Sequence, residues 1–352
     1  MSQSRGSCWR WRLPARKHVI ETICFANDVW WFGHCARGEK RQRCWLSSLT
    51  SIIYEENERE PVPESVECFS AVGAILGEGP VWDSQTLRLY TLDCIDKKLF
   101  CHETAGAIRE IWNLPRSPGS LAIRRNGGML MAFRRGLALF EPATSTLEDI
   151  PTPQIDFKTA LFNDGACDRK GRFWIGTFDP KIEAPVGALY RVDRDLTVRR
   201  MDTGFTLSNG IAWSPDDRTL YFCDSHPGRI WAYDFDLVTG AVENRRLLVD
   251  FEGRKGSPDG CTVDAEGGLW VAAVDAAQIL RFDPAGKEVS RLALPVSRPT
   301  SVMFGGSDQR TLFITSMKLG LSPEELARQP LAGSVFAADV GVAGLPEPRF
   351  TG

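Results

Sequence analysis

Residues 209–222 have the sequence NGIAWSPDDRTLYF, and this stretch decides the fold class. In it, two short apolar runs flank a Ser-Pro-Asp-Asp turn, a pattern that is typical of a β-hairpin. Five other segments repeat this pattern, and one apolar or aromatic residue in the second run marks each copy. The markers follow one another at intervals of 40, 44, 47, 49 and 43 residues: Tyr90, Leu130, Trp174, Tyr221, Trp270 and Phe313.

A repeat of about 40 to 50 residues with several short strands predicts the blades of a β-propeller. Helical repeats of similar length need long faces of 3.6-residue periodicity, which these units lack. We therefore predict an all-β chain that forms a six-bladed β-propeller, with each blade a four-stranded antiparallel sheet. Strand-like segments at 66–72 and 333–339 flank the repeats, and their pairing would close the ring and leave no open sheet edge.

The composition excludes several classes of protein. The 352 residues include 42 Lys and Arg against 45 Asp and Glu, a net charge of −3, so no basic surface indicates nucleic acid as a partner. No apolar run approaches the roughly 18 residues that a membrane-spanning helix needs. The ten cysteines are scattered without a C-x-x-C pair and no N-x-S/T sequence occurs, which favours a reducing, cytoplasmic setting.

The first 62 residues differ from the repeats. Residues 1–50 hold five of the eleven tryptophans and nine Lys or Arg against three Asp or Glu. They contain no apolar stretch long enough for a secretory signal, whereas the basic residues at 1–20 would also suit a transit peptide. We interpret residues 1–62 as an N-terminal extension that ends in a charged, proline-containing linker, and residues 63–352 as the propeller. Two alternatives for this extension stay open: it is disordered, or it is translated sequence from upstream of the true start.

Each repeat also begins with a shared position, which in most copies precedes a glycine. If the first strand of every blade lines the central channel, these positions meet at one mouth of the channel. Four of the six carry oxygen-bearing side chains, and the set is Glu78, Pro118, Asp164, Asn209, Asp259 and Pro299. Carboxylates that meet in a narrow channel repel one another unless a cation or a proton intervenes.

Oxygen ligands without Cys or His favour a hard cation, Ca²⁺ or Mg²⁺, while Mn²⁺ is also compatible and Zn²⁺ less so. The alternative is that Asn and Asp at these positions merely cap turns, as they do in many β-proteins. The spacing of the residues leaves both interpretations open.

At these same positions the chain resembles the regucalcin/gluconolactonase family of six-bladed propellers. The resemblance covers roughly residues 66–352. The matching stretches are LGEGPVWD (76–83), FNDGACDRKGRFWIGTF (162–178), LSNGIAWSPDDRTLYFCDS (207–225), SPDGCTVDAEGGLWVA (257–272), SVMFGG (301–306) and RQPLAGSVF (328–336).

The resemblance implies that one divalent cation is bound by Glu78, Asn209 and Asp259, the positions of the family's GEGP, SNG and PDG motifs. It implies that Asn163 of the NDG motif faces the substrate and a metal-bound water, and that Asp259 doubles as general base. The implied activity is hydrolysis of a gluconolactone-like sugar lactone to the aldonic acid. In family members an arginine two residues before the NDG asparagine holds substrate hydroxyl groups, and Leu161 stands there in this chain. This departure favours a less hydroxylated or differently oriented lactone and leaves the particular lactone open.

We therefore expect a cytoplasmic lactone hydrolase that acts on a small molecule, as a monomer or weak homo-oligomer, without nucleic acid or membrane as partner. Two alternatives stay open: a metal-dependent esterase or phosphotriesterase, and a calcium-binding propeller without catalysis. Segment 179–186 is irregular and proline-bounded, which suits either a lid over the channel mouth or an ordinary surface loop. Residues 224–228, DSHPG, are predicted to form a turn rather than a catalytic triad, because neighbours on one strand point to opposite faces.

Overall fold

The computed structural model describes residues 20–26, 29–35 and 66–352, and the chain divides into two compact units, 1–58 and 59–352. In the first unit, β1 (Ile20–Ala26) pairs antiparallel with β2 (Val29–Cys35). The predicted extension, 1–62, falls mostly outside the described residues, and the predicted start of the propeller at residue 63 also lies outside them.

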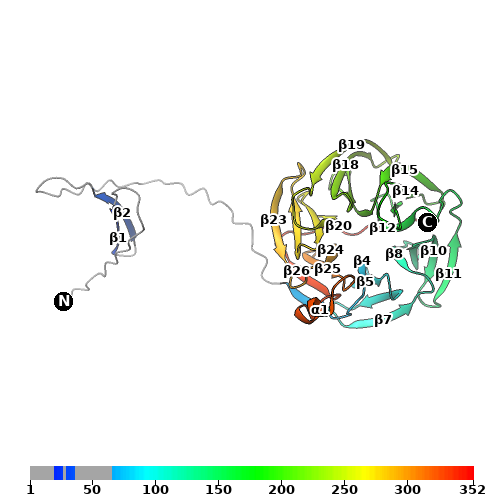
Figure 1. Ribbon diagram of the computed structural model, residues 1–352, viewed down its shortest axis with the longest axis horizontal. Helices are drawn as coiled ribbons and strands as arrows, with labels where there is room; N and C mark the ends of the chain where they lie inside the picture. The colour runs from blue at the N-terminus through cyan, green and yellow to red at the C-terminus, as the bar shows by residue number, and fades with distance from the viewer. Residues whose placement is uncertain (1–19, 27–28, 36–65) are drawn as a thin grey trace, which may run out of the picture. The chain divides into compact units, whose positions relative to one another are not determined.

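In the second unit, six four-stranded antiparallel sheets form the blades of a ring, which confirms the predicted six-bladed β-propeller (Figure 1). Blades 1 to 3, each from its inner to its outer strand, are β4 (Gly77–Asp83), β5 (Arg88–Asp93), β6 (Lys98–His102) and β7 (Ile108–Asn113); β8 (Pro118–Ile123), β9 (Met129–Phe133), β10 (Gly136–Glu141) and β11 (Thr146–Ile150); and β12 (Leu161–Cys167), β13 (Phe173–Phe178), β14 (Gly187–Val192) and β15 (Val198–Phe205).

Blades 4 to 6 follow in the same order: β16 (Ser208–Trp213), β17 (Thr219–Asp224), β18 (Arg229–Asp236) and β19 (Ala241–Asp250); β20 (Ser257–Val263), β21 (Leu269–Val274), β22 (Gln278–Phe282) and β23 (Glu288–Ala293); and β24 (Pro299–Gly305), β25 (Thr311–Ser316), β26 (Val335–Asp339) and β3 (Glu67–Ser70). A short helix, α1 (Pro323–Arg328), lies between β25 and β26. No helix in the described residues has the length and apolar character that crossing a bilayer requires.

The ring closes at the sixth blade, where the two ends of the propeller meet. The N-terminal β3 pairs antiparallel with β26, with Val335 opposite Ser70 and Ala337 opposite Glu67. This pairing confirms the predicted closure. The inner strands then contact one another in the continuous order β4, β8, β12, β16, β20, β24 and back to β4, so their first residues surround one central channel.

The sequence repeat arises because the inner two strands of each blade are buried on both faces, between the neighbouring blades. Every residue of β9 is buried, for example, whereas β7 on the outside is mostly exposed. Strands enclosed in this way need apolar residues at successive positions rather than in strict alternation. All six marker residues lie on the second strand of their blade, and Trp174 of blade 3 contacts Trp213 of blade 4 at a centroid distance of 6.1 Å.

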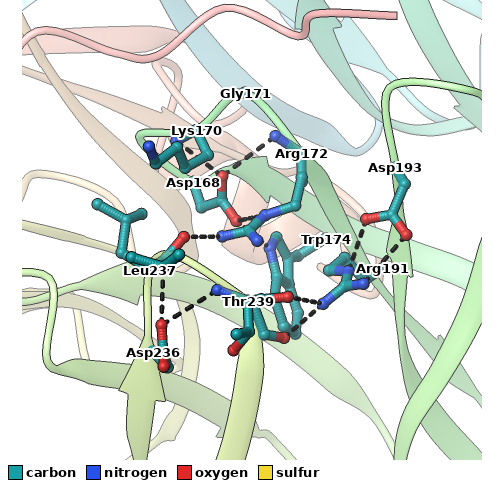
Figure 2. Close-up of polar contacts among 12 residues, drawn as sticks. Asp168, Lys170, Gly171, Arg172, Trp174, Arg191, Asp193, Asp236, Leu237 and Thr239 are labelled. Atoms are coloured by element: carbon teal, nitrogen blue, oxygen red, sulfur yellow. Dashed lines mark hydrogen bonds and ion pairs between the residues drawn. The ribbon is translucent and has the colours of Figure 1, made fainter.

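A buried aspartate organises the contact between blades 3 and 4 (Figure 2). Asp168 is 0% exposed and accepts hydrogen bonds from Nε of Arg172 (2.6 Å) and Nε1 of Trp174 (2.9 Å). Nη2 of Arg172 then donates to the carbonyl oxygen of Leu237 in blade 4 (2.8 Å). Blade 5 repeats the unit, since Asp264 accepts from Nε1 of Trp270 at 2.8 Å. In both blades, an Asp and the Trp six residues after it therefore form a structural hydrogen-bonded pair.

Replacing Asp168 with alanine is expected to lower the free energy of unfolding by about 3–5 kcal/mol, because Arg172 would be left as an unpaired charge in the core. Chemical denaturation followed by tryptophan fluorescence measures this loss. Asp149→Ala is the matched control, because the Asp149 side chain is 70% exposed in its ion pair with Arg116 and such pairs contribute little. Equal losses in the two variants would contradict the structural role of Asp168.

Candidate functional site

Each inner strand carries an irregularity at one mouth of the channel, where the register of its pairing shifts. The shifts occur between Glu78 and Val81, Pro118 and Ser120, Phe162 and Gly165, Ser208 and Ile211, Pro258 and Cys261, and Pro299 and Ser301. The six positions that the sequence predicts to converge all fall at these shifts. A β-bulge re-aims the side chains beside it, so all six blades present their first residues to the channel in an equivalent way.

Glycine follows five of these six positions, and at Gly119 and Gly210 the adjacent inner strands approach very closely. A Cβ on Gly210 would lie 2.6 Å from the carbonyl oxygen of Asp259, and a Cβ on Gly119 would lie 2.5 Å from the carbonyl oxygen of Asn163. No side chain fits at such distances. The close approach at Gly210 places Asn209 of blade 4 beside Asp259 of blade 5.

A chain of hydrogen bonds fixes the orientation of the Asn209 amide. The hydroxyl of Ser225 donates to the carbonyl oxygen of Pro258 (2.5 Å), so it accepts from Nδ2 of Asn209 (2.7 Å). On the other side, Nδ2 of Asn163 donates to Oδ1 of Asn209 (2.7 Å). An amide oxygen has two lone pairs, so Oδ1 of Asn209 keeps one acceptor position for a further ligand.

Three carboxyl groups from blades 1, 3 and 5 share the mouth, and each has a raised pKa. Burial, followed by repulsion from Asp164, raises the pKa of Glu78 from 4.5 to about 8. Burial raises the pKa of Asp164 from 3.8 to about 6. Burial and then repulsion from Glu78 and Asp164 raise the pKa of Asp259 well above its usual range. The guanidinium of Arg134 opposes all three shifts, so the carboxyl groups are incompletely neutralised.

The residues at the mouth fit a hard cation. Oδ1 of Asp259 is buried and has no hydrogen-bond partner in the described part of the chain. A buried carboxylate oxygen without a partner is costly unless a proton or a cation neutralises it. Among the described residues no three His, Cys, Asp or Glu side chains are grouped to hold a metal. A site built on Glu78 and Asp259 would therefore use the amide oxygen of Asn209 as a third ligand.

Below the mouth, the channel contains a cavity of about 70 Å³, which is enough for several water molecules. Its wall is formed by inner strands and by residues 345–348 near the C-terminus. Glu347 in that segment is half-buried, and desolvation raises its pKa from 4.5 to about 7. Asp164 is among the residues that line this cavity, whereas Glu78, Asn209 and Asp259 are not.

Two polar side chains at the mouth are absent from the predicted site. Ser225 lies in a turn after β17, as predicted for residues 224–228, and yet its hydroxyl holds Asn209. The sequence could have indicated Ser225 as a site residue, because the family-like stretch 207–225 ends on this serine. Arg134 follows β9, and its Nη1 donates to the carbonyl oxygen of Phe162 (3.1 Å) and to Oδ1 of Asn163. No family motif marks Arg134.

The loop 179–186 borders the same mouth. It leaves β13 after Phe178, whose ring centroid lies 5.1 Å from Cζ of Arg134. The carboxylate of Asp179 accepts backbone N–H groups of Lys181 (3.1 Å), Glu183 (2.9 Å) and Ala184 (2.8 Å). These bonds give the loop a defined shape, and its role as a lid stays a prediction.

Comparisons with known proteins agree with this architecture. A family profile described as the SMP-30/Gluconolactonase/LRE-like region matches residues 76–318. Regucalcin from Gallus gallus is 33% identical over 294 residues, which span 82% of this chain and 98% of the relative. A 6-deoxy-6-sulfogluconolactonase from Pseudomonas putida is 36% identical over 290 residues, which span 82% of this chain and 99% of the relative. The solved structure of a calcium-binding protein, regucalcin, from Agrobacterium tumefaciens gives a TM-score of 0.77 at 28% identity, covering 81% of this chain and 97% of that one.

Proposed function

This chain belongs to the SMP-30/gluconolactonase/LRE-like family, and on that premise we propose that it hydrolyses a sugar lactone to the aldonic acid with one divalent cation bound at the channel mouth. The observation that carries the proposal is the pair of carboxyl groups, the half-buried Glu78 and the buried Asp259, beside an amide oxygen of Asn209. Among the residues that the structure describes, none donates a hydrogen bond to Oδ1 of Asp259. The Pseudomonas putida relative is named as a gluconolactonase of a sulfonated sugar, which supports the reaction class.

Glu78, Asn209 and Asp259 would hold the cation through oxygen atoms. This set favours Ca²⁺ or Mg²⁺, while Mn²⁺ and Zn²⁺ are the other candidates. The name of the Agrobacterium tumefaciens protein supports Ca²⁺. When bound, a divalent cation polarises the lactone carbonyl and stabilises the negative charge that develops on its oxygen, an effect of several kcal/mol.

The side chains of the mouth supply the remaining steps. Asp259 acts as general base and removes a proton from the attacking water, a role that typically contributes about 10²–10⁴-fold. Asn163 keeps Oδ1 of Asn209 oriented, and we propose that it also faces the substrate. In the ligand-free structure both hydrogens of its Nδ2 go to Ser208 O and Asn209 Oδ1, each at 2.7 Å.

Lactone turnover before and after removal of metal tests the proposal. We expect a pH-indicator assay on a panel of aldonolactones to detect acid release that stops with a chelator and returns when a divalent ion is added. Turnover that survives exhaustive chelation would contradict the role of the cation. Release of acid from simple esters or phosphotriesters, with lactones untouched, would favour the metal-dependent esterase instead.

Tight Ca²⁺ binding without turnover of any lactone or ester would favour a calcium-binding propeller without catalysis, the alternative that the name of the Agrobacterium tumefaciens structure supports. The cytoplasmic location, the monomeric or weakly oligomeric state and the absence of nucleic-acid and membrane partners stay predictions.

A further inference from the structure

The guanidinium of Arg134 lies at the start of β12, the strand on which Leu161 stands in place of the family's arginine. Arg134 stands just after β9 in blade 2, and its backbone carbonyl oxygen accepts the N–H of Phe162 at 3.1 Å. Its side chain extends along the start of β12, where Nη1 contacts the carbonyl oxygen of Phe162 and Oδ1 of Asn163. Leu161 is the next residue along that strand and pairs with Phe178. Arg134 therefore places a guanidinium beside Leu161, from the neighbouring blade.

This guanidinium has hydrogen-bond donors to spare. Nη1 makes both of its hydrogen bonds, whereas Nε and Nη2 donate none to the part of the chain that the structure describes. The ring of Phe178 lies 5.1 Å from Cζ and holds the plane of the group by a cation–π contact. The Nε and Nη2 hydrogens of an arginine form a fork that can bind two neighbouring oxygen atoms at once.

We propose that Arg134 binds the substrate, and that it takes over at the mouth the task of the arginine that Leu161 replaces. The ligand is a lactone whose ring carries neighbouring hydroxyl groups, which accept the free hydrogens of Nε and Nη2. Since this inference deepens the proposed function, it takes its substrate class from it. The guanidinium comes from blade 2 rather than from β12, so the hydroxylated part of the ring lies toward the boundary of blades 2 and 3.

Charge favours neutral hydroxyl groups over an anionic substituent at this position. Glu78, Asp164 and Asp259 all interact with Arg134, so its positive charge is already shared among three acidic groups. An additional anion would meet the field of these carboxylates. A hydroxyl group accepts the same hydrogen bonds without that repulsion.

Arg134→Met separates this role from a structural one when two lactones are compared. Glucono-1,5-lactone carries ring hydroxyl groups, whereas δ-valerolactone has the same ring without them. With the divalent ion that supports turnover, we expect Arg134→Met to lower kcat/KM for gluconolactone by about 10- to 100-fold, the effect of losing hydrogen bonds to a charged group. Loss of the contact with Asn163 affects both lactones, so the variant's kcat/KM for δ-valerolactone is expected to fall much less than that for gluconolactone, and the ratio of the two values is the readout.

Arg135→Met is the matched control, because the neighbouring arginine is exposed and donates to the carbonyl oxygen of Phe157 instead. We expect it to leave both lactones unaffected. Arg134→Lys keeps the positive charge opposite the three carboxyl groups. It is the variant to use if Arg134→Met does not fold. Its expected loss is again larger for gluconolactone than for δ-valerolactone, because lysine cannot reproduce the fork.

Equal losses on both lactones would overturn the proposal, since they would mean that Arg134 acts through Asn163 and the cation site. No loss on either lactone would overturn it as well. If the wild-type protein hydrolyses neither lactone, the proposed function fails. The inference about Arg134 is then tested separately, by calorimetric measurement of sorbitol binding. Weaker binding of sorbitol by Arg134→Met than by Arg135→Met supports it, whereas equal binding, or no binding by the wild type, refutes it.

Discussion

Asp259→Asn is expected to hydrolyse lactones at least about 100-fold more slowly than the wild type, because the amide cannot accept the proton of the attacking water. It should also bind the divalent cation more weakly, since a neutral ligand replaces a charged one in an oxygen site. Initial rates at saturating cation measure the first effect, and calorimetric titration of the cation measures the second. Rates taken at saturating metal keep the loss of the base apart from the loss of the cation.

Asp164→Asn is the matched control for this variant. Asp164 occupies the equivalent bulge of blade 3 and has a raised pKa of about 6, but it is outside the predicted ligand set. We expect its turnover to fall by less than about tenfold at saturating metal. Near-wild-type turnover in Asp259→Asn, or equal losses in the two variants, would remove Asp259 as the general base.

Glu78→Gln is expected to stabilise the metal-free protein at alkaline pH. The pKa of Glu78 is raised from 4.5 to about 8 in the folded state, so its protonated form is favoured by folding. The contribution of Glu78 to the free energy of unfolding is therefore fully present below pH 4.5 and is lost as the pH rises through about 8. By pH 8 the accumulated penalty is about 3–5 kcal/mol, and the glutamine variant avoids it.

Denaturant titrations of the wild type and Glu78→Gln across this pH range, both in chelator, measure the difference. Subtracting one protein from the other cancels groups that titrate alike in both, such as His102, whose pKa burial lowers to about 4. Added divalent cation should stabilise the wild type above pH 7 and stabilise the variant much less. A ligand that binds only the folded state raises the free energy of unfolding more when it binds more tightly. A difference that does not change with pH would contradict the shared burial of these carboxyl groups.

Much of the fold is predictable from the sequence because a propeller repeats one local unit. The inner two strands of every blade have the same environment, so apolar residues and turns recur at similar spacing, and Trp174 and Trp270 occupy equivalent positions after Asp168 and Asp264. Closure is predictable for a related reason: a sheet edge left open at β26 needs a partner, and the segment before the first blade supplies it.

The finer architecture of the mouth is not predictable in the same way. The register shifts that re-aim Glu78, Asn209 and Asp259 depend on how two strands pair, and one strand's residues do not specify that pairing. Arg134 reaches the site from the blade next to Asn163, 29 residues away along the chain, so no local motif contains both. Ser225 lies in a turn whose composition suggests only a turn. Its contact with Asn209 depends on the pairing of β16 with β17, and its bond to Pro258 depends on the packing of blade 4 against blade 5.

A crystal structure of the protein grown with Mn²⁺, with the ion located by its anomalous scattering, tests the shared cation site most directly. We predict one anomalous peak at the channel mouth, with carboxylate oxygens of Glu78 and Asp259 and the amide oxygen of Asn209 each about 2.0–2.6 Å from the ion. A mouth without a peak at saturating Mn²⁺, or an ion bound elsewhere with these three side chains apart, would contradict the account.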